Sequence, residues 1–195
     1  MSDQPQPDDA HHADDSRRLQ AHLEKLSEEQ FRRQMKQAAL LLSSGRAKDA
    51  IPLLERCYDL HPNDVNVLTN LGGAYILLGK HRRAVPYLEK AAEFAPRNPN
   101  VWSNLAAAYL GKLVTATSAR QQQALHAYQR VIELDAAYPN VHYNIGLIHV
   151  DRRDWDAAHE AFSLALEHNP DDQDAANMRR RVHEIRTSPP DPGMN

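Results

Sequence analysis

Residues 65–98 read VNVLTNLGGAYILLGKHRRAVPYLEKAAEFAPRN, and the pattern of this stretch returns along the chain. Ala84 lies 34 residues after Ala50, and Pro96 lies 34 residues after Pro62. Other pairs share this spacing: Tyr75 and Tyr109, Asn70 and Asn104, Ala124 and Ala158, Tyr128 and Phe162. A fixed period of this length, in residues that favour helices, is typical of a helical repeat whose units stack into one continuous core.

Each unit is predicted to contain two amphipathic helices. In the first helix of 65–98, small or apolar residues recur at i, i+3, i+4 and i+7, which is one helix face: Leu68, Leu71, Gly72 and Tyr75. Gly79 ends that helix, and Pro96 ends the second one. Small residues, such as Gly72 and Ala84, let the two helices approach each other, while Tyr75 and Leu88 fill the remaining volume.

These positions resemble the tetratricopeptide repeat, whose pattern is W-x2-L-G-x2-Y, then A-x3-F, then P. The matching residues are Trp102, Leu105, Ala106 and Tyr109 in one unit, and Ile145, Gly146, Ala158, Phe162, Ala165 and Pro170 in the next. The first unit departs from the pattern, with Gln34 and Gln37 in place of Trp and Leu. The resemblance implies an all-α fold, a right-handed α-solenoid of about four helix–turn–helix units, at 31–64, 65–98, 99–138 and 139–172.

The third unit is longer than the others. Asn144 follows Asn104 by 40 residues, whereas Ala158 follows Ala124 by 34, so six extra residues lie between Tyr109 and Ala124. Ser118 and Gln121 have the spacing of a capping box, which predicts that the second helix begins near Ala119. The loop Leu113–Arg120 is then either a tolerated surface insertion or part of a binding face.

The two ends of the chain are predicted to differ from the repeats. Residues 1–15 contain five Asp and no Lys or Arg, which predicts a disordered acidic tail before the folded domain at 16–187. An N-terminal helix is expected from Ser16, with the first repeat helix beginning at a capping box near Ser27. A helix over 173–187 is expected to cap the last repeat, followed by a flexible Pro-rich tail, 188–195.

Composition argues against several functions. The formal net charge of −3 gives no general attraction to nucleic acid, and no apolar run is long enough to span a membrane. A single cysteine, Cys57, and the lack of a secretory signal favour the cytoplasm. Phosphate-loop, zinc-protease and nucleophile-elbow motifs are missing, and His142 and His149 are interpreted as packing residues. We therefore expect neither an enzyme nor a bound cofactor or metal.

The family resemblance implies a concave groove lined by the first helix of each unit. Carried over by register, the groove positions that we select are Arg32, Lys36, Asn66, Thr69, Asn70, Asn100, Ser103, Asn104, Asn140, Tyr143, Asn144 and Leu147. Six of these are asparagines at two matched positions, although Asn is a poor helix former. An asparagine ladder could pair with successive peptide groups of an extended chain. The alternative is that these amides serve the repeat itself.

The two ends of the expected groove differ in chemistry. Arg32 and Lys36 would favour an acidic group, whereas Tyr143 and Leu147 would favour an apolar side chain, unless the C-terminal helix covers them. The chain departs from the carboxylate-clamp subclass that holds the C-terminus of heat-shock chaperones. The matching positions hold Met35, Ala39, Asn70, Asn100 and Asn104, and only Asn70 fits the clamp.

Two functional hypotheses follow. The first is an adaptor or scaffold that binds a protein or an extended peptide in the groove. The second is a structural, assembly or chaperone module that self-associates or binds partners through its ends or convex face, which leaves a homo-oligomer open. The sequence names neither the partner nor the pathway.

Overall fold

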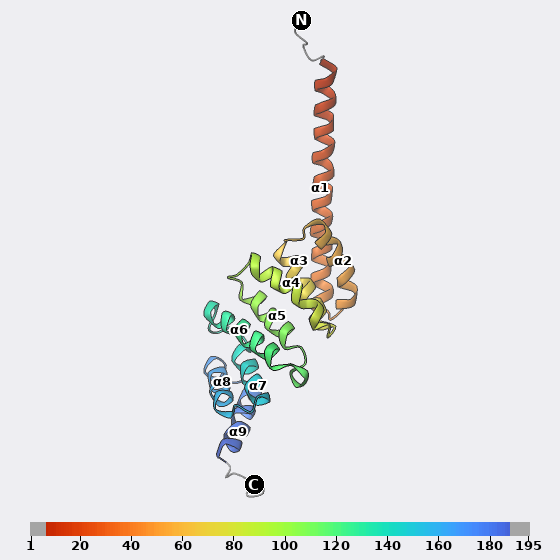
Figure 1. Cartoon of the computed structure of the whole chain (residues 1–195). Coiled ribbons are helices and arrows are strands. Elements are labelled where there is room, and N and C mark those ends of the chain that lie inside the picture. The colour runs from red at the N-terminus through yellow and green to blue at the C-terminus, as the bar shows by residue number, and fades with distance from the viewer. Residues whose placement is uncertain (1–6, 188–195) are drawn as a thin grey trace. The chain divides into compact units, whose positions relative to one another are not determined.

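The computed structural model describes the backbone of residues 7–187 and the side chains from residue 17 onward. Within these residues the chain forms nine α-helices, one short 3₁₀ helix and no strand (Figure 1). Their bounds are α1 Pro7–Ser43, α2 Ala47–Leu60, α3 Val65–Leu77, α4 His81–Phe94, α5 Pro99–Leu110, η1 Leu113–Thr115, α6 Ser118–Leu134, α7 Val141–Asp151, α8 Trp155–His168 and α9 Gln173–Thr187. The chain divides after Pro62 into two compact units, which are described separately.

The first unit is the pair α1 and α2. Ala38 of α1 and Leu54 of α2 are fully buried. The thiol of Cys57 is buried, and its Sγ lies 3.7 Å from Oε1 of Gln34. Gln34 stands where the family pattern has Trp, so at this position an amide, and not an indole, contacts α2.

Helix α1 differs from what the sequence predicts for the N-terminal region. It runs unbroken from Pro7 to Ser43, through the expected break near Ser27. Residues 16–43 contain neither Gly nor Pro, so no residue in this stretch interrupts the helix. The capping-box spacing near Ser27 is not enough by itself to start a new helix. The expected disordered tail, 1–15, lies partly outside the described residues, and its remainder is the first part of α1. Proline is tolerated at a first helical position because its missing N–H would have no partner there.

The second unit contains α3 to α9, and local capping explains where its helices begin. Asp64 accepts hydrogen bonds from the backbone N–H groups of Asn66 and Val67, which starts α3. Asn98 accepts from the N–H of Asn100, and Pro99 follows it as the first residue of α5. Asp154 accepts from the N–H of Ala157 at the start of α8. Each cap pairs a donor that the first helical turn leaves without an internal acceptor.

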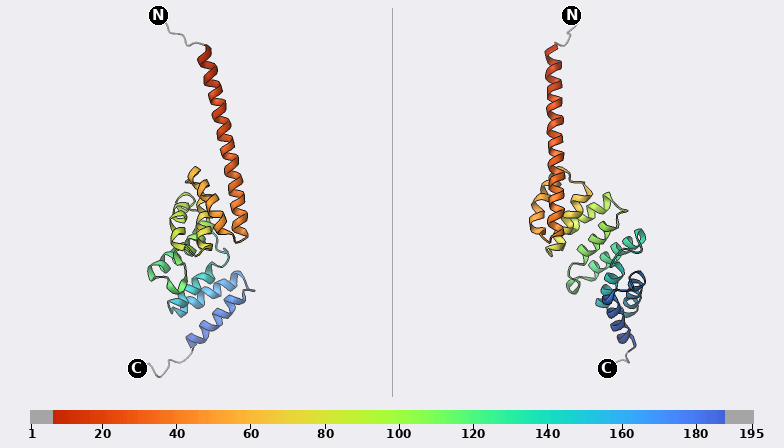
Figure 2. Two further views of the ribbon diagram at one scale, coloured as in Figure 1. Left: turned by 90° about the vertical axis from the view of Figure 1, so that its right-hand side faces the viewer. Right: turned by 180° about the vertical axis from the view of Figure 1, so that it is seen from behind.

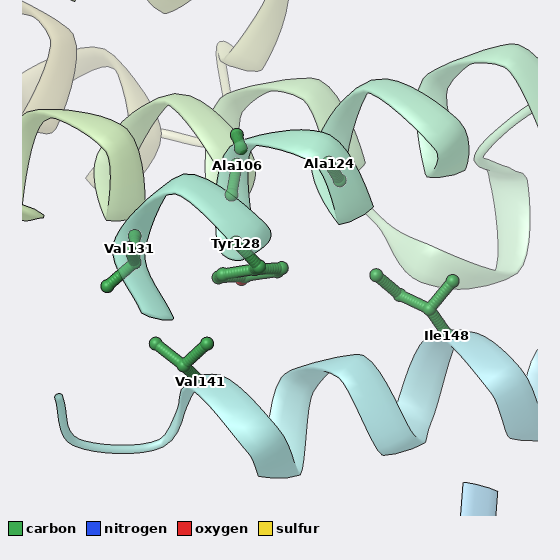
Figure 3. Packing of buried hydrophobic residues seen from close by; sticks show 7 residues of the cluster. Ala106, Ala124, Tyr128, Val131, Val141 and Ile148 are labelled. Carbon is green, nitrogen blue, oxygen red and sulfur yellow. The ribbon is translucent and has the colours of Figure 1, made fainter. Parts of the chain in front are cut away.

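Small residues let the paired helices of this unit approach closely. A Cβ atom added to Gly146 of α7 would lie 2.6 Å from Cε1 of Phe162 on α8, and one added to Gly72 of α3 would overlap Leu88 of α4. In the third pair, Ala106 takes the glycine position and packs in one buried cluster with Tyr128, Val131, Val141 and Ile148 (Figure 3). Each pair therefore joins a small residue to a large one, as the repeat pattern predicts.

The six-residue insertion changes how the third pair is connected. Helix α5 ends at Leu110, Gly111 follows with a φ of 59°, and η1 packs Leu113 against the neighbouring core cluster. Helix α6 begins at Ser118, and its cap is Thr117, whose hydroxyl accepts from the N–H of Arg120. The expected capping box of Ser118 and Gln121 is therefore wrong.

Gln121 takes a tertiary role instead of a capping role. It is 4% exposed, donates from Nε2 to Asp151 at 2.6 Å, and accepts from Nε of Arg152 at 2.9 Å. Arg152 also donates to the backbone carbonyl of Ser118. These hydrogen bonds tie the first turn of α6 to the end of α7, and a buried amide so paired no longer serves its own helix terminus.

Helix α9 covers the last helix pair. Ala175 and Val182 of α9 are buried, and Val182 packs with Ala158 and Phe162 of α8. Both views in Figure 2 show α8 and α9 side by side. None of the described helices is both long and apolar enough to cross a membrane.

Candidate functional site

The three asparagines at the sixth position of their units occupy equivalent places in successive first helices. Asn70 lies in α3, Asn104 in α5 and Asn144 in α7, and all three are half-buried. Across the described part of the chain, no group hydrogen-bonds to their side-chain amides. Each amide therefore keeps two donors and one acceptor for a ligand or for water.

The three asparagines at the second position are in different local environments. Asn66 is exposed, and its backbone N–H is held by Asp64 at 2.8 Å. Oδ1 of Asn100 accepts the hydroxyl of Tyr138 at 2.8 Å. Asn140 has a φ of 63° directly before α7, a left-handed conformation that Asn tolerates better than most residues. Two of these three asparagines thus have a structural role of their own.

Two smaller residues lie beside the sixth-position asparagines. Thr69 is half-buried, and its hydroxyl donates to the carbonyl of Val65 at 2.6 Å within α3. Ser103 of α5 is also half-buried. Both side chains are short and polar, like the amides next to them.

The apolar residues expected at one end of the groove pack on the core. Tyr143 and Leu147 contact the buried cluster of Ala158, Phe162 and Val182, and the rings of Tyr143 and Phe162 lie 5.6 Å apart. Burial, and then Asp174 and Asp172, raise the pKa of Tyr143. This packing corresponds to the alternative in which the C-terminal helix covers these two side chains.

The basic residues expected at the other end belong to the first unit. Arg32 and Lys36 lie on α1, and both are exposed. They are four residues apart, so they occupy neighbouring places on one helix face. Their chemistry suits an acidic group.

Neither of the two histidines on α7 joins a metal-binding cluster. The rings of His142 and His168 stack at 5.2 Å, and burial, followed by His168, lowers the pKa of His142. Nδ1 of His149 lies 3.3 Å from Asp154. Among the residues with described side chains, no three His, Cys, Asp or Glu groups gather as metal ligands do.

The repeat pattern did not predict one hydrogen bond at the candidate site. Tyr138 reaches Asn100 across 38 residues of sequence. Tyr138 lies just before α7 and has no counterpart in the repeat pattern, so periodicity could not reveal it. The chain between α6 and α7 folds back, and this brings the Tyr138 hydroxyl to the Asn100 amide.

Comparison with known families agrees with this arrangement of helix pairs. Models described as Tetratricopeptide repeat match residues 41–107 and 139–172, and one described as TPR repeat matches residues 120–152. The chain belongs to the tetratricopeptide repeat family. Between these matches, residues 108–119 are left out, and they include most of the inserted loop. A search of curated proteins found no match.

Solved structures share the fold of this tetratricopeptide protein. A MamA structure is 23% identical, with a TM-score of 0.71, over 81% of this chain and 83% of MamA. A thermophilic TPR protein of Thermus thermophilus, TTC0263, is 20% identical, with a TM-score of 0.65, over 80% of this chain and 83% of its own. The first TPR of Spaghetti (RPAP3), bound to the HSP90 peptide SRMEEVD, is 22% identical, with a TM-score of 0.57, over 64% and 94% of the two chains. At these identities the likeness concerns the fold, an all-α tetratricopeptide solenoid.

Proposed function

We propose that this protein is a non-catalytic adaptor or scaffold that binds an extended segment of another protein along the first helices of its second unit. The observation that carries the proposal is the row of half-buried amides of Asn70, Asn104 and Asn144, which have no partner among the described residues. An amide that is partly removed from water and left unpaired gains most from a ligand that pairs with it. A peptide backbone offers such pairs regardless of its side chains.

The chemistry of the neighbouring residues supports an extended ligand. Asn66 and Thr69 add short polar side chains near Asn70 on α3, and Ser103 adds one next to Asn104 on α5. The first TPR of Spaghetti, which has the same fold, was solved with a bound peptide. We assign the adaptor to the cytoplasm, where the buried thiol of Cys57 would stay reduced.

Site-specific photocrosslinking tests the proposal. A photoreactive amino acid at Ser103 is expected to capture a partner from extract of the source cells, whereas the same group at Glu160, exposed on α8, captures none. The variant Asn70→Ala/Asn104→Ala/Asn144→Ala should abolish capture and keep its circular dichroism spectrum. Asn177→Ala, an exposed amide on α9, is the matched control. Equal capture by the triple variant and the wild type would contradict the proposal.

A second function, self-association, is favoured by an exposed apolar stripe on α1. Leu19, Leu23 and Leu26 recur at i, i+4 and i+7, and they are 60%, 57% and 48% exposed. Three such side chains on one helix face are a recurrent means of pairing helices. Sedimentation should show a larger species that forms with concentration and is lost in Leu19→Glu/Leu23→Glu. A monomer at all concentrations up to the high micromolar range would exclude it.

A further inference from the structure

The structure has a large open pocket on a different face of α5 from the asparagines. It lies between α4 and α6, has a volume of about 820 Å³, and is called here the α4–α6 pocket. Its floor is Trp102, Leu105 and Tyr109, which recur at i, i+3 and i+7 on α5. None of the groove residues selected from the sequence lines it. Pockets that bind ligands commonly have about 300–1,000 Å³ and a mainly apolar lining.

The insertion contributes to this pocket. Ala124 is the seventh residue of α6, whereas its counterpart Ala84 is the fourth residue of α4, so α6 has three extra residues at its start. Three residues are close to one helical turn. Ala119 belongs to that turn and lines the pocket, together with Gln122 and His126 further along α6. The longer third unit thus extends one wall of the pocket.

The opposite wall is acidic. Glu89 and Glu93 lie one turn apart on α4, both are exposed, and Ala92 between them adds an apolar surface. The hydroxyl of Tyr109 donates to Glu89 at 2.6 Å, which holds that carboxylate beside the floor. No lysine or arginine lines the pocket in the described structure. The negative charge of the α4 wall therefore complements a cation.

The aromatic floor is held in place by local contacts. Nε1 of Trp102 donates to the carbonyl of Pro96 at 2.9 Å, and the ring of His126 meets the indole edge-on at 6.5 Å. The guanidinium of Arg130 lies 5.8 Å from the indole centroid and is paired with Glu133. Trp102 is half-buried, so part of a fixed aromatic surface remains open to a ligand. Aromatic rings attract both apolar groups and cations.

We propose that the α4–α6 pocket binds a partner segment in which a large apolar side chain stands next to a lysine or arginine. The apolar side chain packs on Trp102 and Leu105, and the cation pairs with Glu89 and Glu93. This second site does not depend on the asparagine row. The two sites can therefore be tested separately on the same protein.

The test uses three acetylated and amidated tetrapeptides as probes: Lys-Phe-Leu-Lys, Glu-Phe-Leu-Glu and Lys-Gly-Gly-Lys. The chain has two tryptophans, so the indole N–H signals of Trp102 and Trp155 report the pocket and a distant helix in one NMR spectrum. Lys-Phe-Leu-Lys should move the Trp102 signal saturably and leave Trp155 in place. The other two peptides should bind at least about tenfold more weakly, because each lacks either the charge or the apolar group.

Variants of the full chain connect the signal to the pocket. Glu89→Gln/Glu93→Gln should weaken Lys-Phe-Leu-Lys binding by about tenfold, and Gln still accepts the Tyr109 hydroxyl. Glu160→Gln/Glu167→Gln on α8 makes the same change in net charge and should leave binding unchanged. Ala119→Phe, at an exposed position, should block the pocket without disturbing the core.

Several results would overturn the inference. These are an unmoved Trp102 signal, equal binding of the glutamate peptide, or equal weakening by the α8 control. Loss of binding in Asn70→Ala/Asn104→Ala/Asn144→Ala, with the pocket variants unaffected, would move the probe to the asparagine row and also overturn it. Failure of the asparagine row to bind its own partner, with the peptide results as expected, would leave the pocket standing.

Discussion

The second and third helix pairs, α3–α4 and α5–α6, are the same repeat built in two ways. In the second, Leu68 and Tyr75 are 0% and 5% exposed, and the connection between the helices is short. In the third, the corresponding Trp102 and Tyr109 are only half-buried, the connection is longer, and a pocket lies beside them. The shared core positions show that a repeat needs its small and large residues in register. The difference shows that the remaining surface is free to take another role.

The largest effect on stability is expected in the second helix pair, α3–α4. Leu88→Ala should lower the free energy of unfolding by about 3 kcal/mol, because it removes a fully buried side chain and leaves a cavity. Gly72→Ala alone should cost about 2 kcal/mol, because the new Cβ would overlap Leu88. In the Leu88→Ala background the same methyl group should cost far less. Urea unfolding of the four proteins measures this cycle, and strictly additive costs would mean that the two positions do not pack together.

The third pair should depend on a contact that the second lacks. Gln121→Leu should cost about 2 kcal/mol, since it leaves Asp151 and Arg152 without their buried partner. Gln129→Leu, at an exposed position of the same helix, should be close to neutral. Thermal unfolding of both variants makes the comparison. Equal stability of the two would show that the tie between α6 and α7 contributes nothing.

A smaller difference is expected at the helix starts. Thr117→Ala should lower the free energy of unfolding by about 1 kcal/mol, because it removes the cap of α6. Lys80 holds the same place before α4 and makes no side-chain cap. Lys80→Ser should therefore stabilise the second pair by a fraction of that amount. Denaturant midpoints of the two variants should move in opposite directions, and a shift in the same direction would contradict this account.

The smallest effect concerns pH. Burial, and then Lys112 and Arg120 of the insertion region, lower the pKa of His81 on α4 below 6.5. The folded chain then binds fewer protons than the unfolded chain just below that pH, so stability should fall as the pH drops through 6.5. His142 and His159 also have lowered pKa values and add in the same direction. In His81→Gln the fall between pH 7 and pH 5.5 should be shallower, and an unchanged slope would remove His81 from the explanation.

Repetition made much of this molecule predictable. The spacing of Ala84, Ala124 and Ala158 locates the second helix of each of these pairs, and the excess between Tyr109 and Ala124 locates the insertion. Matched positions reinforce one another, so a weak signal in one unit is corrected by the next. The sixth-position asparagines were found in the same way. What they bind remains our proposal.

Features that occur once had no such support. The unbroken α1, the hydrogen bonds of Gln121 and the contact of Tyr138 with Asn100 have no counterpart in another repeat. A capping-box spacing at Ser118 suggested the wrong cap, because the amide of Gln121 has a better partner 30 residues away in Asp151. Local propensity is a weak guide where a tertiary contact competes with it.

The sequence by itself determined the helical repeat, its register and the pairing of small with large residues, because these depend on spacings of three, four and 34 residues along one chain. Only the tertiary structure decided which asparagine amides stay unpaired, which apolar side chains α9 covers, and that α4, α5 and α6 line an open pocket with one acidic wall. Those outcomes depend on distances between residues far apart in the chain, and a spacing along the sequence does not specify them.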